Sequence, residues 1–298
     1  MEYYRQLSQS PSAIIQALDA VDYIADEALA TACFLAAKMH NPLYLEGEPG
    51  VGKTSLAYAL GKAFDLQVFR LQCYEGVDIS QALYDWDFRK QLLYLKQAEL
   101  SGADSASLEV DLYDRRFMLE RPVLQAFKNS PCILLIDEID RADDAFEAFL
   151  MEALSDFTVS VPEVGTIRPV VPPLVFLTSN RTREVHDALK RRCLYYWMDH
   201  PKPEQELAIL LRRFPDLSQS FGREIVKVAH HLRDGGLLKS PGIAETIDWA
   251  AALLALEATS LDKTTIDLTL GSLLKYREDH ERVKRGELAL LQASDDRL

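Results

Sequence analysis

A glycine-rich segment early in the chain constrains the fold more than any other feature of this sequence. Residues 47–54 read GEPGVGKT; the short apolar run Leu43-Tyr44-Leu45 precedes them, and a helical pattern continues to about Phe64. The segment matches G-x-x-x-x-G-K-[ST] at the fixed positions Gly47, Gly52, Lys53 and Thr54. A strand that leads through such a loop into a helix is the context that this pattern requires. The segment therefore predicts an α/β fold with a phosphate-binding loop.

Each residue type in this loop suits a bound nucleotide. Glycines let backbone N–H groups curve around phosphates, and the N-terminus of the following helix adds partial positive charge. Lys53 is expected to reach the β- and γ-phosphates, and the Thr54 hydroxyl to ligate Mg²⁺. The predicted nucleotide contacts are Gly47, Glu48, Pro49, Gly50, Val51, Gly52, Lys53, Thr54 and Ser55. The alternative interpretation is a glycine-rich turn that only starts a helix.

Two acidic residues follow the most apolar run of the chain. Residues 132–136 read CILLI, which is typical of a strand buried on both faces of a parallel sheet. Asp137 and Glu138 come next, at the strand end where ligands bind in open α/β sheets. Asp137 is expected to hold the Mg²⁺ shell, and Glu138 to act as the general base that activates water. The alternative is an acidic cap for the next helix, a role that Asp140 or Asp143 also suits.

Further polar residues stand where two later elements end. Asn180 closes the apolar strand LVFLTSN at 174–180, and its amide is expected to orient the attacking water. A turn-forming asparagine is the alternative. Arg191 and Arg192 lie at the end of a predicted helix, where cations suit the helix dipole. The functional alternative for this pair is an arginine finger that reaches the γ-phosphate of a neighbouring subunit.

The pattern of elements changes near residue 200. Before it, helices at 12–40 are followed by apolar strands that alternate with helical stretches. After it, helical patterns alone occur, at about 204–213, 219–233, 243–259, 262–275 and 278–293. His200-Pro201-Lys202-Pro203 is the best linker, because paired prolines continue neither a helix nor a central strand. We expect an α/β domain at 1–200 and an all-α domain at 204–298. The first should contain a helix over 90–120, with a polar, Ser-rich interruption near 101–107, and a hairpin near 158–170.

Charge and composition argue against several classes of protein. Lys+Arg 33 against Asp+Glu 46 gives a net charge of −13, which disfavours a protein that coats nucleic acid. The four cysteines lie far apart and match neither a zinc site nor a disulfide framework. The N-terminus MEYYRQLSQS lacks the pattern of a signal peptide, and the apolar stretches of the first third are too short to span a bilayer. A cytoplasmic protein without a membrane span is expected.

In this order, these motifs resemble those of AAA+ ATPases, and within them the MoxR group. The matching pieces are LYLEGEPGVGKT, ILLIDEIDRADDAFEAFLMEALSDFTVSVPEVGTI and PLVFLTSN. Three further strings are similar to the CoxD-like branch, which accompanies molybdenum hydroxylases of the carbon monoxide dehydrogenase type. They are RLQCYEGVDISQALYDWDFRKQLLYLK at 70–96, FMLERPVLQAF at 117–127 and GSLLKYREDHE at 271–281. The resemblance covers about residues 20–285.

The resemblance implies a P-loop AAA+ core followed by a helical lid, in a hexameric ring with ATP and Mg²⁺ between subunits. Gly47 to Thr54 correspond to Walker A, Asp137 and Glu138 to Walker B, Asn180 to sensor 1, and Arg192 to the arginine finger, with Arg191 as the alternative. It also implies a chaperone that helps to insert a cofactor or metal centre, with a partner that carries a von Willebrand factor A domain. For the CoxD-like branch the client would be a molybdenum hydroxylase.

Two positions and two rival functions stay open. Many AAA+ lids carry a sensor-2 arginine near the start of the third lid helix, but the segment SPGIAETIDWA at 240–250 has none; Arg223 or Arg233 are the candidate replacements. Gln72 stands where a residue that couples substrate binding to Glu138 is often found. One rival is a nucleic-acid-dependent motor, which the charge of −13 disfavours. The other is a slow, nucleotide-gated scaffold.

Overall fold

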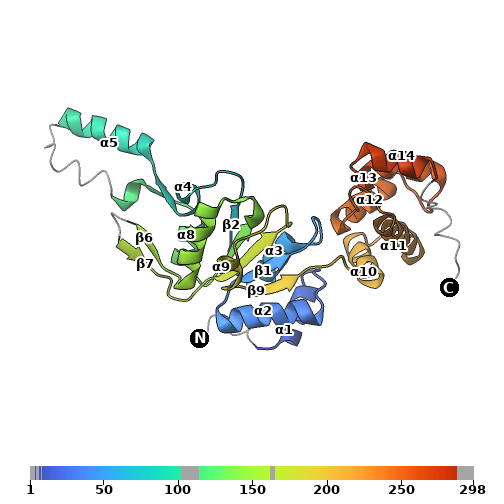
Figure 1. The fold of residues 1–298 in the computed structure, drawn as a ribbon, viewed down its shortest axis with the longest axis horizontal. Helices are drawn as coiled ribbons and strands as arrows, with labels where there is room; N and C mark the ends of the chain where they lie inside the picture. Colours follow the sequence, from blue (N-terminus) through green and yellow to red (C-terminus); the bar gives the residue numbers. More distant parts are fainter. Residues whose placement is uncertain (1–3, 5–6, 8, 102–113, 162–164, 287–298) are drawn as a thin grey trace. The chain divides into compact units, whose positions relative to one another are not determined.

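The computed structural model describes residues 4, 7, 9–101, 114–161 and 165–286 (Figure 1). The chain divides into two compact units. The first, which we call the α/β unit, spans Met1–Ala17, Asp26–Glu46 and Ala57–Tyr196. The second, which we call the helical unit, spans Leu18–Ala25, Gly47–Leu56 and Trp197–Leu298, and so contains the phosphate-binding loop as well as the C-terminal helices.

A five-stranded sheet forms the centre of the α/β unit. Its order is β2 (Val68–Gln72), β5 (Ile133–Asp137), β8 (Leu174–Ser179), β1 (Leu43–Glu46) and β9 (Leu194–Trp197). The pairs β2–β5, β5–β8 and β8–β1 are parallel. Every residue of β1, β5 and β8 is buried, as expected for strands covered on both faces. The predicted parallel α/β sheet is confirmed.

Helices join the strands and pack around the sheet (Figure 1). They are α1 (Pro11–Asp19), α2 (Glu27–Met39), α3 (Lys53–Phe64), α7 (Pro122–Lys128), α8 (Asp144–Ser155) and α9 (Asp187–Lys190), with the 3-10 turn η2 (Ile139–Arg141) after β5. Phe127 of α7 and Phe146 of α8 lie in one core cluster with Leu134 of β5. Because helical crossovers join parallel strands, the carboxyl ends of β2, β5 and β8 lie at one edge of the sheet.

The segment predicted as a helix over 90–120 is an α-helix in its first part only. After α4 (Ile79–Ala82) and β3 (Tyr84–Trp86), helix α5 (Phe88–Ser101) extends away from the sheet; η1 (Arg115–Phe117) and β4 (Met118–Glu120) follow (Figure 1). β3 and β4 pair antiparallel, with Tyr84 opposite Glu120. The helix prediction is confirmed over 90–101 and is wrong at 118–120, because pairing with a distant strand overrides the local preference there. Most of the Ser-rich interruption predicted near 101–107 lies outside the described residues.

A second antiparallel pair lies within the predicted hairpin at 158–170. β6 (Val159–Val161) pairs with β7 (Gly165–Ile167), with Ser160 opposite Thr166. Val159 and Val161 are buried in the core cluster of the sheet while Ser160 is exposed, which is the alternation of a strand with one covered face. Residues 162–164, between these two strands, lie outside the described residues.

The C-terminal part of the helical unit is a bundle. Its helices are α10 (Pro203–Arg213), α11 (Gln219–Asp234), α12 (Ile243–Ala255), α13 (Lys263–Leu273) and α14 (Arg277–Lys284). Trp249 of α12 is fully buried in the bundle core, and its Nε1 donates to Thr269 Oγ1 at 2.8 Å. The region predicted as helix at 287–293 lies outside the described residues. Among the residues that the structure describes, no helix has the length and apolar character that crossing a bilayer requires.

Candidate functional site

The phosphate-binding loop has a backbone that only its glycines adopt easily. Gly50 and Gly52 have φ angles of 82° and 100°, which lie in the left-handed region. A Cβ atom at Gly47 would lie 2.2 Å from the carbonyl oxygen of Met198. Lys53 begins helix α3, and its buried Nζ donates to the carbonyl oxygens of Gly47 at 2.7 Å and Glu48 at 2.8 Å. The lysine therefore closes the loop on itself at a helix N-terminus.

The other predicted loop residues differ in exposure. Val51 is buried, Gly50, Gly52 and Thr54 are half-buried, and Glu48, Pro49 and Ser55 are exposed. The turn before α12 packs against this loop, since a Cβ at Gly242 would lie 2.9 Å from the carbonyl oxygen of Pro49. Glu245 accepts a hydrogen bond from the Gly242 N–H at 3.0 Å. The region where a sensor-2 arginine is expected thus presents a glycine and a carboxylate to the loop.

Arg233, one of the two candidate replacements for that arginine, is used inside the bundle. Its guanidinium donates to Glu206 Oε1 at 2.7 Å, to Glu206 Oε2 at 2.6 Å and to the Pro241 carbonyl oxygen at 2.6 Å. Burial alone would raise the pKa of Glu206, but hydrogen bonds from Arg233 and His230 outweigh it and hold that pKa below its ordinary value. Arg233 therefore has a structural role, which is to neutralise the buried Glu206 carboxylate. The side chain of Arg223, the other candidate, is exposed.

Asp137 and Glu138 stand at the carboxyl end of β5. Asp137 is the last strand residue, and its side chain is 3% exposed. Thr178 of β8 donates its hydroxyl to Asp137 Oδ1 and accepts the Glu138 N–H at 2.9 Å. Glu138 has a φ of 56°, in the left-handed region. The chain therefore turns sharply after the strand, and the two consecutive carboxylates point in different directions.

The carboxylate of Glu138 lies among polar side chains from three segments. Gln72 Nε2 donates to Glu138 Oε2 at 3.0 Å, and Asn180 Nδ2 donates to Glu138 Oε1 at 3.4 Å. Arg141 Nε lies 2.9 Å from Glu138 Oε2, and the Glu138 side chain is 28% exposed. The structure thus brings Glu138, Asn180 and Gln72 together. The left-handed residue of the turn after β8 is Arg181, with a φ of 59°, rather than Asn180.

The acidic residues after Glu138 have separate structural roles. Asp143 caps helix α8, since it accepts the Phe146 N–H at 2.8 Å, so α8 needs neither Asp137 nor Glu138 as its cap. Asp140 is buried and accepts the N–H of Thr182 at 2.8 Å and its hydroxyl at 2.7 Å. It therefore ties the loop after β8 to the loop after β5. Asp140, Thr182 and Arg141 line one side of a pocket of about 630 Å³ at this edge.

The arginine pair lies on the surface. Arg191 is the C-cap of α9, and both Arg191 and Arg192 have exposed side chains. Arg192 Nη1 approaches the Met151 carbonyl oxygen at 3.5 Å. This exposed position at a helix end is compatible with both predicted roles of the pair, interaction with the helix dipole and contact with another molecule.

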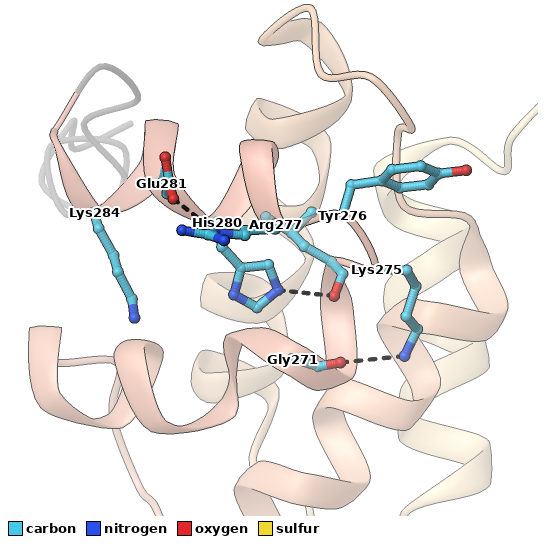
Figure 2. A pocket seen from close by; sticks show the side chains of 8 residues that line it. Gly271, Lys275, Tyr276, Arg277, His280, Glu281 and Lys284 are labelled. Carbon is cyan, nitrogen blue, oxygen red and sulfur yellow. Dashed lines mark hydrogen bonds and ion pairs between the residues drawn. The ribbon is translucent and has the colours of Figure 1, made fainter.

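A second pocket, of about 560 Å³, lies between α13 and α14 in the bundle (Figure 2). Lys275 Nζ donates to the carbonyl oxygen of Gly271 at 3.3 Å, and the His280 ring contacts the Leu274 carbonyl oxygen at 3.0 Å. Arg277 pairs with Glu281 at 3.0 Å. These side chains close the end of α13 and brace α14, and none of the predicted site residues lines the pocket.

Sequence reasoning missed three of the described residues that contact the acidic pair: Thr178, Arg141 and Arg70. Arg70 forms an ion pair with Asp137. Its Nε and Nη2 lie 2.9 Å and 2.6 Å from Asp137 Oδ2. A signal was present, because Arg70 and Gln72 are two residues apart on a predicted strand and so point to the same face. Both residues lie near the carboxyl end of β2, at the edge of the sheet where ligands bind.

Comparison with known proteins bears on the family and the fold of this chain. Residues 42–193, just over half of the chain, match the sequence model of the AAA domain of the dynein-related subfamily. The fold is similar to the crystal structure of a candidate ATPase from Cytophaga hutchinsonii, with 15% identity, a TM-score of 0.50, and coverage of 98% of this chain and 96% of that one. The RuvB Holliday junction branch migration motor of Thermotoga maritima aligns with 19% identity, a TM-score of 0.46, and coverage of 89% of this chain and 72% of that one. With the parallel sheet, its phosphate-binding loop and the matched segment, the chain belongs to the AAA domain family, dynein-related subfamily.

Proposed function

We propose that this chain binds ATP with Mg²⁺ and hydrolyses it. The observation that carries the proposal is the environment of Glu138, which follows the buried Asp137 and receives hydrogen bonds from Gln72 and Asn180. Glu138 is a partly exposed carboxylate at the ligand-binding edge of a parallel sheet, held by these two amides and by an ion pair with Arg141 at 2.9 Å. Such a placed carboxylate suits the activation of a water molecule. Membership of the AAA family supports the same assignment.

The available donors fit Mg²⁺. This ion prefers hard oxygen ligands and is usually held by one or two protein groups together with phosphates and water. Thr54 supplies a hydroxyl and Asp137 a carboxylate. No group of three His, Cys, Asp or Glu side chains suited to a metal occurs among the described residues. We assign Thr54 and Asp137 to Mg²⁺, which when bound would neutralise charge on the phosphates.

The remaining roles follow from the chemistry of the side chains. The backbone N–H groups of residues 47–52 would cradle the phosphates, and the Lys53 ammonium would exchange its contacts with Gly47 and Glu48 for phosphate oxygens. Glu138 would accept a proton from the attacking water, which the Asn180 amide helps to orient. Catalysis would be mainly electrostatic, through charges placed before the reaction begins.

Phosphate release and nucleotide binding by the purified protein test this function. We expect ATP hydrolysis in the presence of Mg²⁺ and none in excess EDTA, together with saturable binding of a fluorescent ATP analogue. If the protein neither binds the analogue nor releases phosphate with Mg²⁺ present, the assignment is wrong. Binding without turnover would favour the slow, nucleotide-gated scaffold instead.

We further propose a ring, with a hexamer as the expected size, in which Arg192 contacts the γ-phosphate held by a neighbour. Replacing Arg192 with alanine should lower turnover by more than about tenfold, because the γ-phosphate loses a cation in the transition state. When wild type and variant are mixed at increasing ratios, hydrolysis should fall faster than the fraction of wild type. Arg191→Ala is the matched control. A proportional fall, or a larger loss with Arg191→Ala, would remove Arg192 from this role.

The client part of the proposal rests on the resemblance to the MoxR group and its CoxD-like branch. We propose a cytoplasmic chaperone, with an ATPase domain at 1–200 and a lid at 204–298, that assists insertion of a metal cofactor into a molybdenum hydroxylase together with a von Willebrand A-domain partner. Stimulation of hydrolysis by either protein would support it. Stimulation by duplex DNA, with a steep dependence on salt, would favour the nucleic-acid motor.

A further inference from the structure

Arg70 of β2 contacts Asp137, the residue of the acidic pair that we assign to Mg²⁺. Two of its nitrogens lie within 3 Å of Asp137 Oδ2, at 2.9 Å for Nε and 2.6 Å for Nη2. The Asp137 side chain is 3% exposed, whereas that of Arg70 is 42% exposed. The guanidinium therefore approaches a buried carboxylate from solvent and neutralises much of its charge.

Strand register explains this contact. β2 and β5 run parallel, with Arg70 opposite Leu135 and Gln72 opposite Asp137. Residues two apart on a strand point to the same face, so Arg70, Gln72 and Asp137 share one face of the sheet. Arg70 lies one step back along β2, and its long side chain reaches forward to the carboxylate. A shift of the pairing by one residue would move Arg70 and Gln72 to the opposite face and break both contacts.

Arg70 also determines which way the Gln72 amide points. Arg70 Nη2 contacts Gln72 Oε1. A guanidinium can only donate hydrogen bonds, so the amide atom that faces it must be the oxygen. The Gln72 amide nitrogen is then left to face Glu138, and it donates to Glu138 Oε2 at 3.0 Å. One hydrogen-bonded path therefore runs from Asp137 through Arg70 and Gln72 to Glu138.

We propose that Arg70 is a positioning residue that couples the metal side of the site, at Asp137, to the water side, at Glu138. The proposal rests on the proposed ATPase function and assigns a control element to the same site. Arg70 competes with Mg²⁺ for the negative charge of Asp137. At the same time it keeps Gln72 oriented as a donor to Glu138. A change in the contact between Arg70 and Asp137 thereby alters the hydrogen bond from Gln72 to Glu138, the residue that activates water.

The first test measures the Mg²⁺ requirement for nucleotide binding, without turnover. Mg²⁺ is titrated into the full-length protein with a fluorescent, non-hydrolysable ATP analogue. Arg70→Gln should lower the half-saturating Mg²⁺ concentration by about threefold to tenfold, since it removes a positive charge beside Asp137. Arg70→Lys keeps the charge and should stay within about twofold of wild type. Arg277→Gln, an equal charge change at an exposed residue of α14, is the matched control and should also leave the value unchanged.

The second test is a double-mutant cycle on maximal turnover at saturating Mg²⁺. Arg70→Gln and Gln72→Leu should each lower turnover, and the double variant should be no slower than Gln72→Leu alone, because both changes break the same path. Thermal unfolding of each variant confirms that it is folded. An unchanged Mg²⁺ requirement in Arg70→Gln would overturn the metal side of the proposal, and losses that multiply in the double variant would overturn the coupling. A wild-type protein without Mg²⁺-dependent binding would instead reject the ATPase assignment itself.

Discussion

Glu138→Gln should reduce steady-state ATP hydrolysis by about a hundredfold or more while nucleotide affinity stays within about twofold of wild type. Glutamine has nearly the same shape and can still contact Asn180 and Gln72, but it cannot accept a proton from the attacking water. The affinity should be retained because Glu138 lies after β5 and is not part of the phosphate-binding loop. Phosphate release and titration of a fluorescent ATP analogue measure the two quantities separately.

Two further variants make this result specific. Lys53→Ala should lose nucleotide binding itself, since the ammonium that reaches the phosphates is gone. Glu184→Gln is the matched control, because Glu184 is a surface carboxylate 78% exposed, and it should hydrolyse ATP like wild type. Hydrolysis by Glu138→Gln at the wild-type rate would show that another group activates the water, and the assignment of Asp137 and Glu138 as a functional pair would fall with it.

The second large effect concerns the stability of the bundle. Arg233→Met should lower the free energy of unfolding by about 3–5 kcal/mol, because it leaves a buried carboxylate without its main partner. Glu206 is fully buried, and Arg233 donates to both of its oxygens. Chemical denaturation followed by circular dichroism measures the change. The double variant Arg233→Met/Glu206→Leu should recover most of the loss, since an apolar pair carries no charge that must be kept from water.

An exposed ion pair of the same kind provides the comparison. Arg212 contacts Asp19, and their side chains are 33% and 57% exposed. Arg212→Met should cost less than about 1 kcal/mol, because solvent screens a surface pair. If Arg233→Met is as mild as Arg212→Met, the Glu206 carboxylate finds another partner or takes up a proton. Arg233 would then not be required for the stability of the bundle.

Local patterns in the sequence predicted most of the elements that carry the candidate site. The alternation of apolar strands and helices predicted the parallel sheet, because a strand covered on both faces must be apolar along its whole length. The helices of the bundle also lie close to their predicted ranges. The prediction failed at 118–120, where β4 pairs with β3. Such pairing depends on a segment far away in the chain and leaves little mark on local composition.

The loop at 47–54 is a part of the site whose internal contacts follow from local sequence. Gly50 and Gly52 adopt left-handed backbone angles, and Lys53 closes the loop through contacts with residues 47 and 48. All of these interactions join residues within one short stretch, so the motif alone specifies them. The same holds for Asp143, which caps the helix that begins at the next residue.

The surroundings of the two carboxylates depend on contacts that no local pattern encodes. Arg70 and Thr178 come from strands distant in sequence, and Asn180 directly follows the strand of Thr178. Strand register decides which of these side chains face Asp137 and Glu138. The same is true of Arg233, which a reading of the sequence leaves open for the nucleotide but which the bundle uses to neutralise Glu206. The sequence alone determined the loop, the apolar strands and the order of acidic and amide residues, because these follow from neighbours in the chain. Tertiary structure decided the partner of each charge, since burial and strand pairing set the distances on which hydrogen bonds and ion pairs depend.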